Sequence, residues 1–597
     1  MATNFIGGER QLLYEVLAQK YDEIEKASGS IEKTNIFSDL LKETPRDLVG
    51  KVLALTIGKL FPDWKGEPEL GVAERTAVQI VAAAASVPES AVFDSLRRTG
   101  DIGVTGESLL QEGIGQMSLF PQEITITSVH DIFLKVTRAS GSGSNKEKLA
   151  LLVGLLNDAK PIEIRYLLRT ITGTMRLGLG YMGIMDALSI AFAGDKKFRP
   201  EIESAFNVCS DLVEVASLLA TEGLRGLEHI KAKVGIPIRM MAAKKLSSAA
   251  EIIEKAGGSV LVEYKYDGER VQVHKDGEKV VLFSRRQEVI TYQYPDVVEY
   301  VRKHVKPSTC VLEGECLAID PLTNRIRPFQ DLMRRRRKTG IEEMQKEIPV
   351  VIRFFDILYS EGEDVTSKPM LTRRELLSKA VDSCDVVDLT IGEVIDHPDA
   401  LDAMFAEAID SGHEGIIAKA IHKDSTYQAG SRSWLWIKLK ASYQEGMTDS
   451  VDLVVVGAMH GRGKRTGVYG TILASAYDPV NDTYPTVCKI GTGFSDDVLI
   501  QFKDRLDIHR TEAMDPRVLS DIQADIWFEP VIVIEVLGDE ITISPTHHAG
   551  RGQINGGGLA IRFPRFTGRW RDDKEPHQAT TIAELIEIFE NQKSRST

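Results

Sequence analysis

Apolar and polar residues recur at helical spacing along the first 232 residues of the chain. Runs such as Glu74 to Ser86 and Leu149 to Leu156 follow this spacing, and Gly, Pro and Ser residues separate one run from the next. The pattern predicts an all-α region over residues 1–232.

The pattern changes near residue 258 to short runs of β-branched and aromatic residues with turn residues between them. Predicted strands include Val260 to Tyr266, Val271 to His274 and Lys279 to Phe283, and a helix is predicted at Arg373 to Val381. An α+β domain is therefore expected over residues 233–440.

Residues 441–597 show short strands at the spacing of a small barrel, followed by a last helix at Ile582 to Asn591. The predicted strands are Leu453 to Ala458, Thr471 to Tyr477, Thr486 to Ile490 and Val531 to Val536.

The length and composition agree with several folded domains. The chain has 597 residues, which at roughly 150 residues per domain suggests about four domains or three larger ones. Hydrophobic residues make up 43% and charged residues 27%, which excludes disordered and fibrous classes.

The net charge of −14 argues against a protein that binds nucleic acid through a uniformly positive surface. Nucleic acid would have to contact local basic tracts, namely Arg334 to Lys338, Arg562 to Lys574 and Lys464 with Arg465. Such tracts bind phosphates in a salt-dependent way. For the first tract a solvated run of charge is the alternative.

Five widely spaced cysteines without a C-x-x-C pair argue against a disulfide framework and favour a reducing compartment. The N-terminus lacks the features of a signal peptide, and the apolar runs are far shorter than the roughly 20 residues that span a bilayer. A cytoplasmic protein without a membrane partner is expected.

The segment from Glu263 to Arg270 is the most informative for chemistry, because it reads as a strand that runs into an Asp-Gly turn. Side chains alternate along a strand, so Glu263 and Lys265 share a face, and the turn is expected to fold Arg270 back towards them. Taken alone, this four-residue K-x-D-G pattern is a weak signal, and a surface hairpin with an exposed lysine explains it better.

Other segments pair charged residues in the same way, although each pair taken singly also fits the solvated face of an amphipathic strand. The pairs are Glu313 with Glu315 and Lys438 with Lys440, and the segment between them adds Glu414 and Lys419.

Nucleotidyl transfer is the chemistry that requires this set of residues. A lysine amine attacks the α-phosphorus of a nucleotide only when it is unprotonated, and free lysine has a pKa of about 10.4. Burial and neighbouring positive charge, here from Arg270, Lys438 and Lys440, favour the neutral amine. Glu315 and Glu414 are suited to magnesium shared with phosphate oxygens. Lys438 and Lys440 would stabilise charge that develops on the α-phosphate.

Over nearly its whole length the chain resembles the ATP-dependent DNA ligases of the archaeal and eukaryotic replicative type. The resemblance rests on the ordered motifs of covalent nucleotidyltransferases. It implies that Lys265 becomes adenylated, that Arg270 is the arginine just after it, and that Glu263 lies near the adenine. Other matched positions bind the nucleotide or its metal. Arg285 is implied on the phosphate side, Phe355 stacked on adenine, Glu315 near the ribose and metal, and Glu414 as the second metal ligand. The later motifs supply Lys419, Lys438 and Lys440, and then Arg571, Asp573 and Lys574; Trp436 is favoured over Trp434 as the family tryptophan.

The resemblance implies a helical DNA-binding domain (1–232), an adenylation domain (233–440) and an OB-fold domain with a C-terminal helix (441–597). The implied activity is sealing of nicks in double-stranded DNA through a lysyl-AMP intermediate and an adenylated DNA 5′ end. ATP and Mg²⁺, with Mn²⁺ as a substitute, are the implied donor and metal, and the family acts in replication, repair and recombination. A monomer is expected.

Two segments of the helical domain resemble parts of that family that contact partners. Gly141 to Lys146 and Arg176 to Gly180 resemble loops that contact the DNA backbone, with a helix cap beside an exposed basic residue as the alternative. Gln116, Leu119 and Phe120 resemble a peptide that binds the sliding clamp. The alternative is a loop whose apolar residues pack into the helical domain.

Three other functions compete with this interpretation. An RNA-directed relative, either an mRNA-capping guanylyltransferase or an RNA ligase, shares the lysine and the acids, but it typically lacks so long a helical domain. An NAD-dependent DNA ligase is disfavoured because the sequence has no four-cysteine zinc module. A clamp-associated DNA-binding scaffold would have no reason to retain so many charged groups in one cleft.

Overall fold

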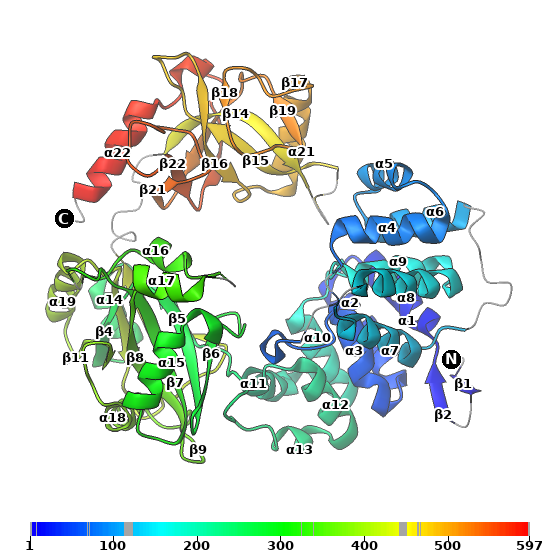
Figure 1. Ribbon diagram of the computed structural model, residues 1–597, viewed down its shortest axis with the longest axis horizontal. Coiled ribbons are helices and arrows are strands. Elements are labelled where there is room, and N and C mark those ends of the chain that lie inside the picture. Colours follow the sequence, from blue (N-terminus) through cyan, green and yellow to red (C-terminus); the bar gives the residue numbers. More distant parts are fainter. Residues whose placement is uncertain are drawn as a thin grey trace. The chain divides into compact units, whose positions relative to one another are not determined.

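The computed structural model describes residues 3–6, 9–67, 70, 72–112, 123–141, 143–323, 325–337, 340–440, 450–461, 465 and 467–594 (Figure 1). The chain forms two compact units. The first comprises Met1–Ala242, Asp267–Thr390 and Ile421–Ser433, and the second comprises Ala243–Tyr266, Ile391–Ala420 and Trp434–Thr597. The central region of the sequence therefore contributes strands to both units.

Helices fill the N-terminal region, as the spacing of its apolar residues predicts. In α7, Ile126, Val129 and Phe133 lie on one face and are fully buried. The side chain of Thr125 caps the helix by accepting a hydrogen bond from the backbone N–H of Ser128. The helices are α1 (Tyr14–Lys26), α2 (Ser30–Glu43), α3 (Val49–Ile57), α4 (Glu74–Ala85), α5 (Glu89–Thr99), α6 (Ile102–Glu112), α7 (Ile126–Arg138), α8 (Ser144–Asp158), α9 (Pro161–Ile171), α10 (Tyr181–Leu188), α11 (Arg199–Cys209), α12 (Leu212–Glu222) and α13 (Leu224–Leu227).

The prediction of an all-α region is wrong at its N-terminal end. There β1 (Thr3–Ile6) and β2 (Glu9–Leu12) form an antiparallel pair. Strands of four residues are too short to show a period of their own beside long helical runs, so the sequence pattern gave no signal for them.

The first unit contains a sheet with the strand order β10-β8-β7-β5-β6, and β9 pairs with β8. One face carries Val271, Val273 and Leu312, which pack under α15 and α18. The opposite face carries the alternate residues, among them Arg270 and Gln272. The elements are β5 (Glu269–Asp276), β6 (Lys279–Ser284), β7 (Thr309–Ala318), β8 (Val350–Ser360), β9 (Glu363–Asp364), β10 (Val387–Leu389), α15 (Pro295–His304), α16 (Phe329–Met333), α17 (Ile341–Glu347) and α18 (Met370–Ala380).

The second unit contains a sheet with the strand order β11-β4-β12-β13-β3. Ile416, Ile437 and Leu439 are fully buried on one of its faces, and α19 packs against β4 and β12. The elements are β3 (Ala242–Lys245), β4 (Val260–Lys265), β11 (Gly392–Ile395), β12 (Gly415–Ala420), β13 (Arg432–Lys440), α14 (Ala249–Lys255) and α19 (Pro398–Asp410).

The Asp-Gly turn that follows β4 does not close a hairpin, so that expectation is wrong. Strand β4 pairs with β11 and β12, whereas β5 pairs with β6 and β7. At the start of β5 the chain runs close to β7, and a Cβ atom on Gly268 would lie 2.4 Å from the carbonyl oxygen of Cys316. Glycine permits this close approach, which lets the chain pass from one sheet to the other.

The C-terminal region is rich in strands, as predicted, and α22 adds Leu585 and Phe589 to its core. Figure 1 shows this helix in red beside β21 and β22, and the side-chain oxygen of Gln592 accepts a hydrogen bond from the backbone N–H of Ile541 at 3.0 Å. One sheet contains β14 (Val451–His460), β15 (Tyr469–Ser475), β16 (Tyr484–Ile490), β17 (Arg510–Thr511), β18 (Val518–Leu519), β19 (Ile526–Phe528), β20 (Val533–Leu537) and β23 (Arg565–Trp570); β21 (Glu540–Ser544) pairs with β22 (Gly558–Arg562), and the helices are α21 (Asp496–Asp507) and α22 (Ile582–Ser594).

Within the described part of the chain, no individual helix has the length and apolar character needed to cross a bilayer. One pair, α4 with α5, meets the length and composition test jointly, but the two helices are bent by 115°.

A buried ion pair joins α18 to β8 in the first unit. The guanidinium of Arg373 contacts the carboxylate of Asp356 through two hydrogen bonds of 2.8 and 3.0 Å, and both side chains are fully buried. Arg373 also donates to the carbonyl oxygens of Lys368 and Ser425. An ion pair of this kind is costly to break, because the remaining charge stays buried without its partner.

We therefore expect Asp356→Ala to lower the free energy of unfolding of this domain by about 3–5 kcal/mol, measured by urea denaturation. The matched control is Lys379→Ala on the same helix, where the pair with Glu375 is exposed and its loss should change stability little. Equal effects of the two substitutions would contradict the argument from burial.

Candidate active site

A row of residues across three strands of the second unit places Lys265 beside Lys440. Gly415 at the start of β12 lies opposite Lys265 on β4 and opposite Lys440 on β13. Residues that face one another across strands lie on the same side of a sheet. The two lysines therefore project from the same face, on either side of a residue without a side chain.

The carboxylate of Glu414 lies between these two lysines. Its Oε2 atom is 2.7 Å from Nζ of Lys265 and also contacts Nζ of Lys440. The backbone N–H of Glu414 donates to the carbonyl oxygen of Lys265 at 3.0 Å. Burial opposes ionisation of Glu414, but the charges of Lys265 and Lys440 outweigh it and lower its pKa to about 2. Glu414 is therefore an anion at neutral pH.

Further along the same face, Glu263 and Lys419 form a buried ion pair. Their carboxylate and ammonium groups are 2.6 Å apart, and both side chains are almost fully buried. Nζ of Lys419 also lies 4.7 Å from the ring centre of Trp436. Trp436 is buried, whereas Trp434 is partly exposed. The choice of Trp436 as the family tryptophan stays a prediction.

Alternation on β13 agrees with the sequence analysis. Ile437 and Leu439 are buried, and Lys438 and Lys440 are only partly covered on the opposite face. Lys438 lies opposite Ile417 in the register, and Ile417 in turn lies opposite Glu263. One face of this sheet thus carries Glu263, Lys265, Lys419, Lys438 and Lys440.

In the first unit, Arg270 forms the centre of a second cluster of charged residues. Its guanidinium donates to the carboxylate of Glu313 at 2.8 Å and to the carbonyl oxygen of Met241 at 2.7 Å, and it lies 5.2 Å from the ring centre of Phe355. Tyr427 also donates to Glu313, at 3.0 Å. Glu313 was expected as the strand-face partner of Glu315, but the sequence carries no local signal for its ion pair with Arg270 or for Tyr427.

Glu315 and Arg285 are partners of this cluster. Glu315 lies opposite Arg270 in the pairing of β7 with β5 and is half-buried. Burial and the nearby charges of Arg270 and Arg432 lower the pKa of Arg285, and Glu315 opposes this shift. Four of the predicted residues, Arg270, Arg285, Glu315 and Phe355, thus belong to the first unit.

The last motif lies on the strand-rich domain, where acidic residues hold its two basic side chains. Arg571 contacts Asp452 at 2.6 Å and Asp573 at 2.8 Å, and Lys574 contacts Asp452 at 2.7 Å. The charges and hydrogen bonds of Arg571 hold the pKa of Asp573 well below its usual range. Asp452 was not found from the sequence, because it lies more than a hundred residues away in the chain.

The structure corrects one expectation about the first basic tract. Arg335 is buried and pairs with Asp296 through bonds of 2.8 and 3.0 Å, so it is not placed to contact DNA. Arg334 and Arg336 are paired with Glu347 and Glu269. Acidic residues elsewhere in the chain thus pair with Arg334, Arg335 and Arg336, which a local count of charge cannot show.

The expected DNA-contacting loop at Arg176 also takes part in contacts within the helical domain. Arg176 pairs with Asp101 at 3.0 Å and donates to the carbonyl oxygen of Gly100 at 2.8 Å. The DNA contact of this loop stays a prediction. Several residues named from the sequence lie outside the described residues: Gln116, Leu119, Phe120, Ser142, Lys338 and Lys464.

The acidic residues fit a magnesium ion that substrate phosphates help to hold. Across the described ranges, no group of three or more His, Cys, Asp or Glu side chains is placed to hold a metal by itself. Mg²⁺ typically binds through one or two carboxylates together with phosphate oxygens and water. Glu414, ionised and partly exposed, and Glu315, half-buried, meet that requirement as separate ligands.

A strand face with a lysine beside a bridging glutamate and two further lysines, in a chain with helical and strand-rich flanking regions, defines a nucleotidyltransferase. Family models assign this class more closely. They match the DNA ligase N terminus over residues 13–189, the ATP dependent DNA ligase domain over 240–440 and the ATP dependent DNA ligase C terminal region over 465–574.

Similar proteins extend over nearly the whole chain. DNA ligase 2 of Thermofilum pendens is 48% identical over 596 residues, which cover 98% of this chain and 99% of the relative. The DNA ligase of Sulfophobococcus zilligii is 44% identical, with 98% and 97% covered. The chain therefore belongs to the ATP-dependent DNA ligase family. The solved structure Pmar-Lig_PreS3 covers 93% of this chain and 99% of its own, with a TM-score of 0.54 and 16% identity, and shows similarity of fold alone.

The position between the two lysines requires glycine. A substitution there therefore tests the alignment of Lys265, Gly415 and Lys440 across β4, β12 and β13. Gly415 has a φ of +142°, and a Cβ atom there would lie 2.1 Å from the carbonyl oxygen of Leu439. We expect Gly415→Ala to separate β12 from β13 and to abolish covalent AMP transfer to the protein, measured by intact mass after incubation with ATP and magnesium.

The matched control is Gly412→Ala, three residues earlier. Gly412 also has a positive φ, of +81°, but has no neighbouring atom within 4 Å of the added carbon. This substitution strains the backbone by about 1–2 kcal/mol and should leave AMP transfer intact. Normal AMP transfer by the Gly415→Ala protein would show that the reaction does not depend on the close spacing of β12 and β13.

Proposed function

We propose that this chain joins the 5′-phosphate and 3′-hydroxyl at a nick in duplex DNA and that Lys265 carries AMP between ATP and the DNA. The observation that carries the proposal is the position of Lys265 on a strand face with Glu414, Lys438 and Lys440. Membership of the ATP-dependent DNA ligase family supports the same reaction.

In the first step, the Nζ atom of Lys265 forms a bond to the α-phosphorus of ATP, and the bond to pyrophosphate breaks. The lysine must lose a proton before it attacks. Lys440 shares the carboxylate of Glu414 with Lys265, so a second positive charge lies close to the nucleophile and to the phosphate that it attacks. Glu414 holds the amine in position through this ion pair.

In the second step, the 5′-phosphate of the nick attacks the lysyl-AMP and releases Lys265. In the third, the 3′-hydroxyl attacks the activated phosphate and AMP leaves. The α-phosphate of the original ATP takes part in all three steps. We assign Lys438 and Lys440 to the charge that develops on its oxygens, because both lysines share the face of Lys265.

The remaining residues are proposed to bind the donor and its metal. Phe355, beside the guanidinium of Arg270, offers a ring for adenine, and the pair of Glu263 with Lys419 offers polar groups to the base. Arg285 is assigned to the phosphate side of the nucleotide. Glu315 in the first unit and Glu414 in the second are each proposed as a ligand of Mg²⁺, with Mn²⁺ as a substitute, and the metal would neutralise phosphate charge.

The family models that match the flanking regions argue against the competing functions. The N-terminal and C-terminal family models both describe DNA ligases, and the central model describes an ATP-dependent domain. A capping guanylyltransferase, an RNA ligase and an NAD-dependent ligase are therefore disfavoured. The ion pairs of Lys265 and Lys419 also argue against a scaffold without activity.

A sliding clamp is the proposed protein partner, through Gln116, Leu119 and Phe120. The sequence of these three residues supports this part of the proposal. The domain limits at 232 and 440 likewise stay proposals, and the family models, which match residues 13–189, 240–440 and 465–574, agree with a three-part organisation.

Lys265→Ala should abolish the covalent AMP adduct, measured as added mass after incubation with ATP and magnesium. Lys265→Arg should fail too, because a guanidinium stays protonated and is no nucleophile. Lys379→Ala, which removes an exposed lysine on α18, serves as the control and should form the adduct normally. Adduct formation at the wild-type rate by either Lys265 variant would place the nucleophile elsewhere.

The double substitution Arg571→Ala/Lys574→Ala should block adduct formation from ATP but leave most sealing of a nick that already carries 5′-AMP. We assign these two residues to the β- and γ-phosphates, which are present only during adenylation. Phosphate would compete with Asp452, which now holds both side chains.

Lys438→Ala is the comparison for this experiment, because the α-phosphate is present in every step and both activities should fall. If the Arg571/Lys574 variant formed the adduct normally and failed to seal the pre-adenylated nick, these residues would instead serve in binding DNA.

A further inference from the structure

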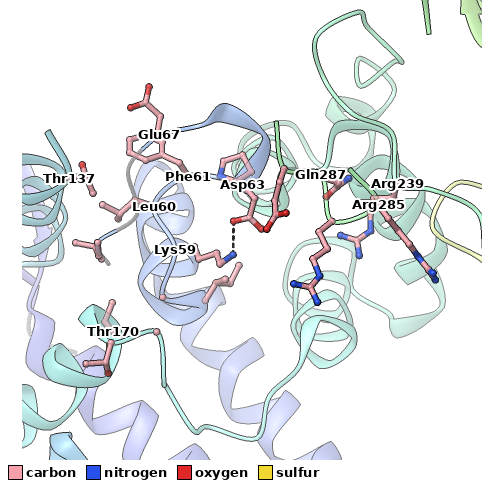
Figure 2. A pocket seen from close by; sticks show the side chains of 18 of the residues that line it. Lys59, Leu60, Phe61, Asp63, Glu67, Thr137, Thr170, Arg239, Arg285 and Gln287 are labelled. Carbon is pink, nitrogen blue, oxygen red and sulfur yellow. Dashed lines mark hydrogen bonds and ion pairs between the residues drawn. The ribbon is translucent and has the colours of Figure 1, made fainter. Parts of the chain in front are cut away.

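Several arginines line one large cavity of the first unit. The cavity has a volume of about 1130 Å³, and Figure 2 shows Arg239, Arg285 and Gln287 on one side of it, with Lys59, Leu60 and Thr170 on the other. Its basic lining residues are Lys59, Arg239, Arg285, Arg286 and Arg432, and its acidic ones are Asp63, Glu67 and Glu288.

The arginines of this cavity differ from most other arginines of the unit in their partners. Arg270, Arg335 and Arg373 are each held by a carboxylate. In contrast, no ion pair joins the guanidinium of Arg239, Arg285, Arg286 or Arg432 to a carboxylate among the described residues. On the opposite wall, Asp63 is paired with Lys59 at 2.6 Å.

Like charges gathered in this way repel one another. Burial, and then the positive charges of Arg270 and Arg432, lower the pKa of Arg285. An anion that enters the cavity would relieve this repulsion.

Two of the arginines project from a turn whose backbone is tightly fixed. The hydroxyl of Ser284 accepts hydrogen bonds from the backbone N–H groups of Arg286 and Glu288, both at 3.2 Å, and the N–H of Gln287 donates to the carbonyl of Ser284 at 2.8 Å. Gln287 has a positive φ of 68°, which is uncommon for a residue other than glycine. The strain is retained in a turn that presents Arg285 and Arg286 to the cavity.

The other two arginines come from segments that are bound to each other and to α11. The backbone N–H of Arg239 donates to the carbonyl of Asn207, and the N–H of Gly430 donates to the carbonyl of Arg239, both at 2.8 Å. A Cβ atom on Gly430 would lie 2.4 Å from the side chain of Asn207, so the loop that leads to Arg432 packs closely on α11. The guanidinium of Arg239 rests 4.7 Å from the ring centre of Phe206.

Side chains on the polar face of β5 also form hydrogen bonds with the backbone of the segment before Arg239. Gln272 accepts a hydrogen bond from the N–H of Ile238 at 2.8 Å and donates to its carbonyl at 3.0 Å. The N–H of Gly235 donates to Nδ1 of His274 at 3.0 Å, and burial lowers the pKa of this histidine to about 3, so it stays neutral. The arginines are therefore presented by a rigid, hydrogen-bonded surface.

We propose that Arg239, Arg286 and Arg432 bind phosphates of one DNA strand beside the nick and that this surface positions the strand for the reaction. The proposal rests on the proposed function, since the DNA that it positions is the substrate of that reaction. It assigns three residues of the cavity to DNA. Arg285, which lines the same cavity, is already assigned to the nucleotide.

A polynucleotide fits this surface better than a second mononucleotide. The three residues lie on three separate segments around a cavity far larger than one phosphate needs, and they are exposed or half-buried rather than enclosed. Guanidinium groups spaced along a surface match the repeating charge of a nucleic-acid backbone. The opposite wall includes Gly58 and Gly173 at the C-terminal ends of α3 and α9, which are the negative ends of helix dipoles. Phosphates are therefore expected on the arginine side.

The test measures binding of full-length Arg286→Gln/Arg432→Gln protein to a nicked duplex over a series of salt concentrations. Loss of two phosphate contacts should reduce the slope of log K against log salt by about 1.8 and should weaken binding by about tenfold per arginine. Adduct formation from ATP should proceed at the wild-type rate. Arg239→Gln added to this pair should lower the slope again.

The control variant is Arg302→Gln/Lys303→Gln on α15, which removes two exposed charges outside the cavity lining and should keep the wild-type slope. Arg286→Lys/Arg432→Lys should restore most of the slope, because charge is retained, whereas a folding defect would not be repaired by a longer cationic side chain.

An unchanged slope in the glutamine variant would overturn the proposal, and so would loss of adduct formation with normal DNA binding, since the cavity would then serve the nucleotide. Failure of the wild-type protein to take up AMP would instead overturn the proposed function. The binding measurement stays independent of that result.

Discussion

One carboxylate, that of Glu414, organises the reactive face of the second unit. It contacts the ammonium groups of Lys265 and Lys440, and the two positive charges outweigh the cost of burying it. The contact is possible because Gly415, the next residue, has no side chain between the two lysines. If the strands were farther apart, each lysine would find water instead, and the second charge beside the nucleophile would be lost.

Basic side chains that stabilise the fold differ from those proposed to bind substrate in how fully carboxylates pair with them. Arg335 and Arg373 are buried with carboxylates that satisfy them; Arg373 holds α18 on β8, and Arg335 joins the segment after α16 to α15. Arg571 and Lys574 are held by Asp452 on the strand-rich domain, yet they stay partly accessible to a competing phosphate. Arg286 and Arg432 have no such carboxylate among the described residues, and they line a cavity instead. The degree of pairing thus matches the roles proposed for these residues.

Much of the fold could be predicted from local pattern. Alternation placed Ile437 and Leu439 on the buried face of β13 and the lysines on the other, and the structure agrees. Helical spacing located α4 within one residue, and the four strands predicted in the strand-rich region overlap β14, β15, β16 and β20. The order of charged motifs along the chain was enough for the resemblance to DNA ligases, which the family models confirm.

The sequence by itself determined which residue types share a strand face, because alternation depends only on neighbours in the chain. The tertiary structure alone decided which strands lie side by side. It placed β4 and β5 in different sheets, buried Arg335 against Asp296, and brought Asp452 to Arg571. Each of these contacts joins residues far apart in sequence. Their energy depends on burial and distance in the folded chain, and a local pattern of charge carries no information on either.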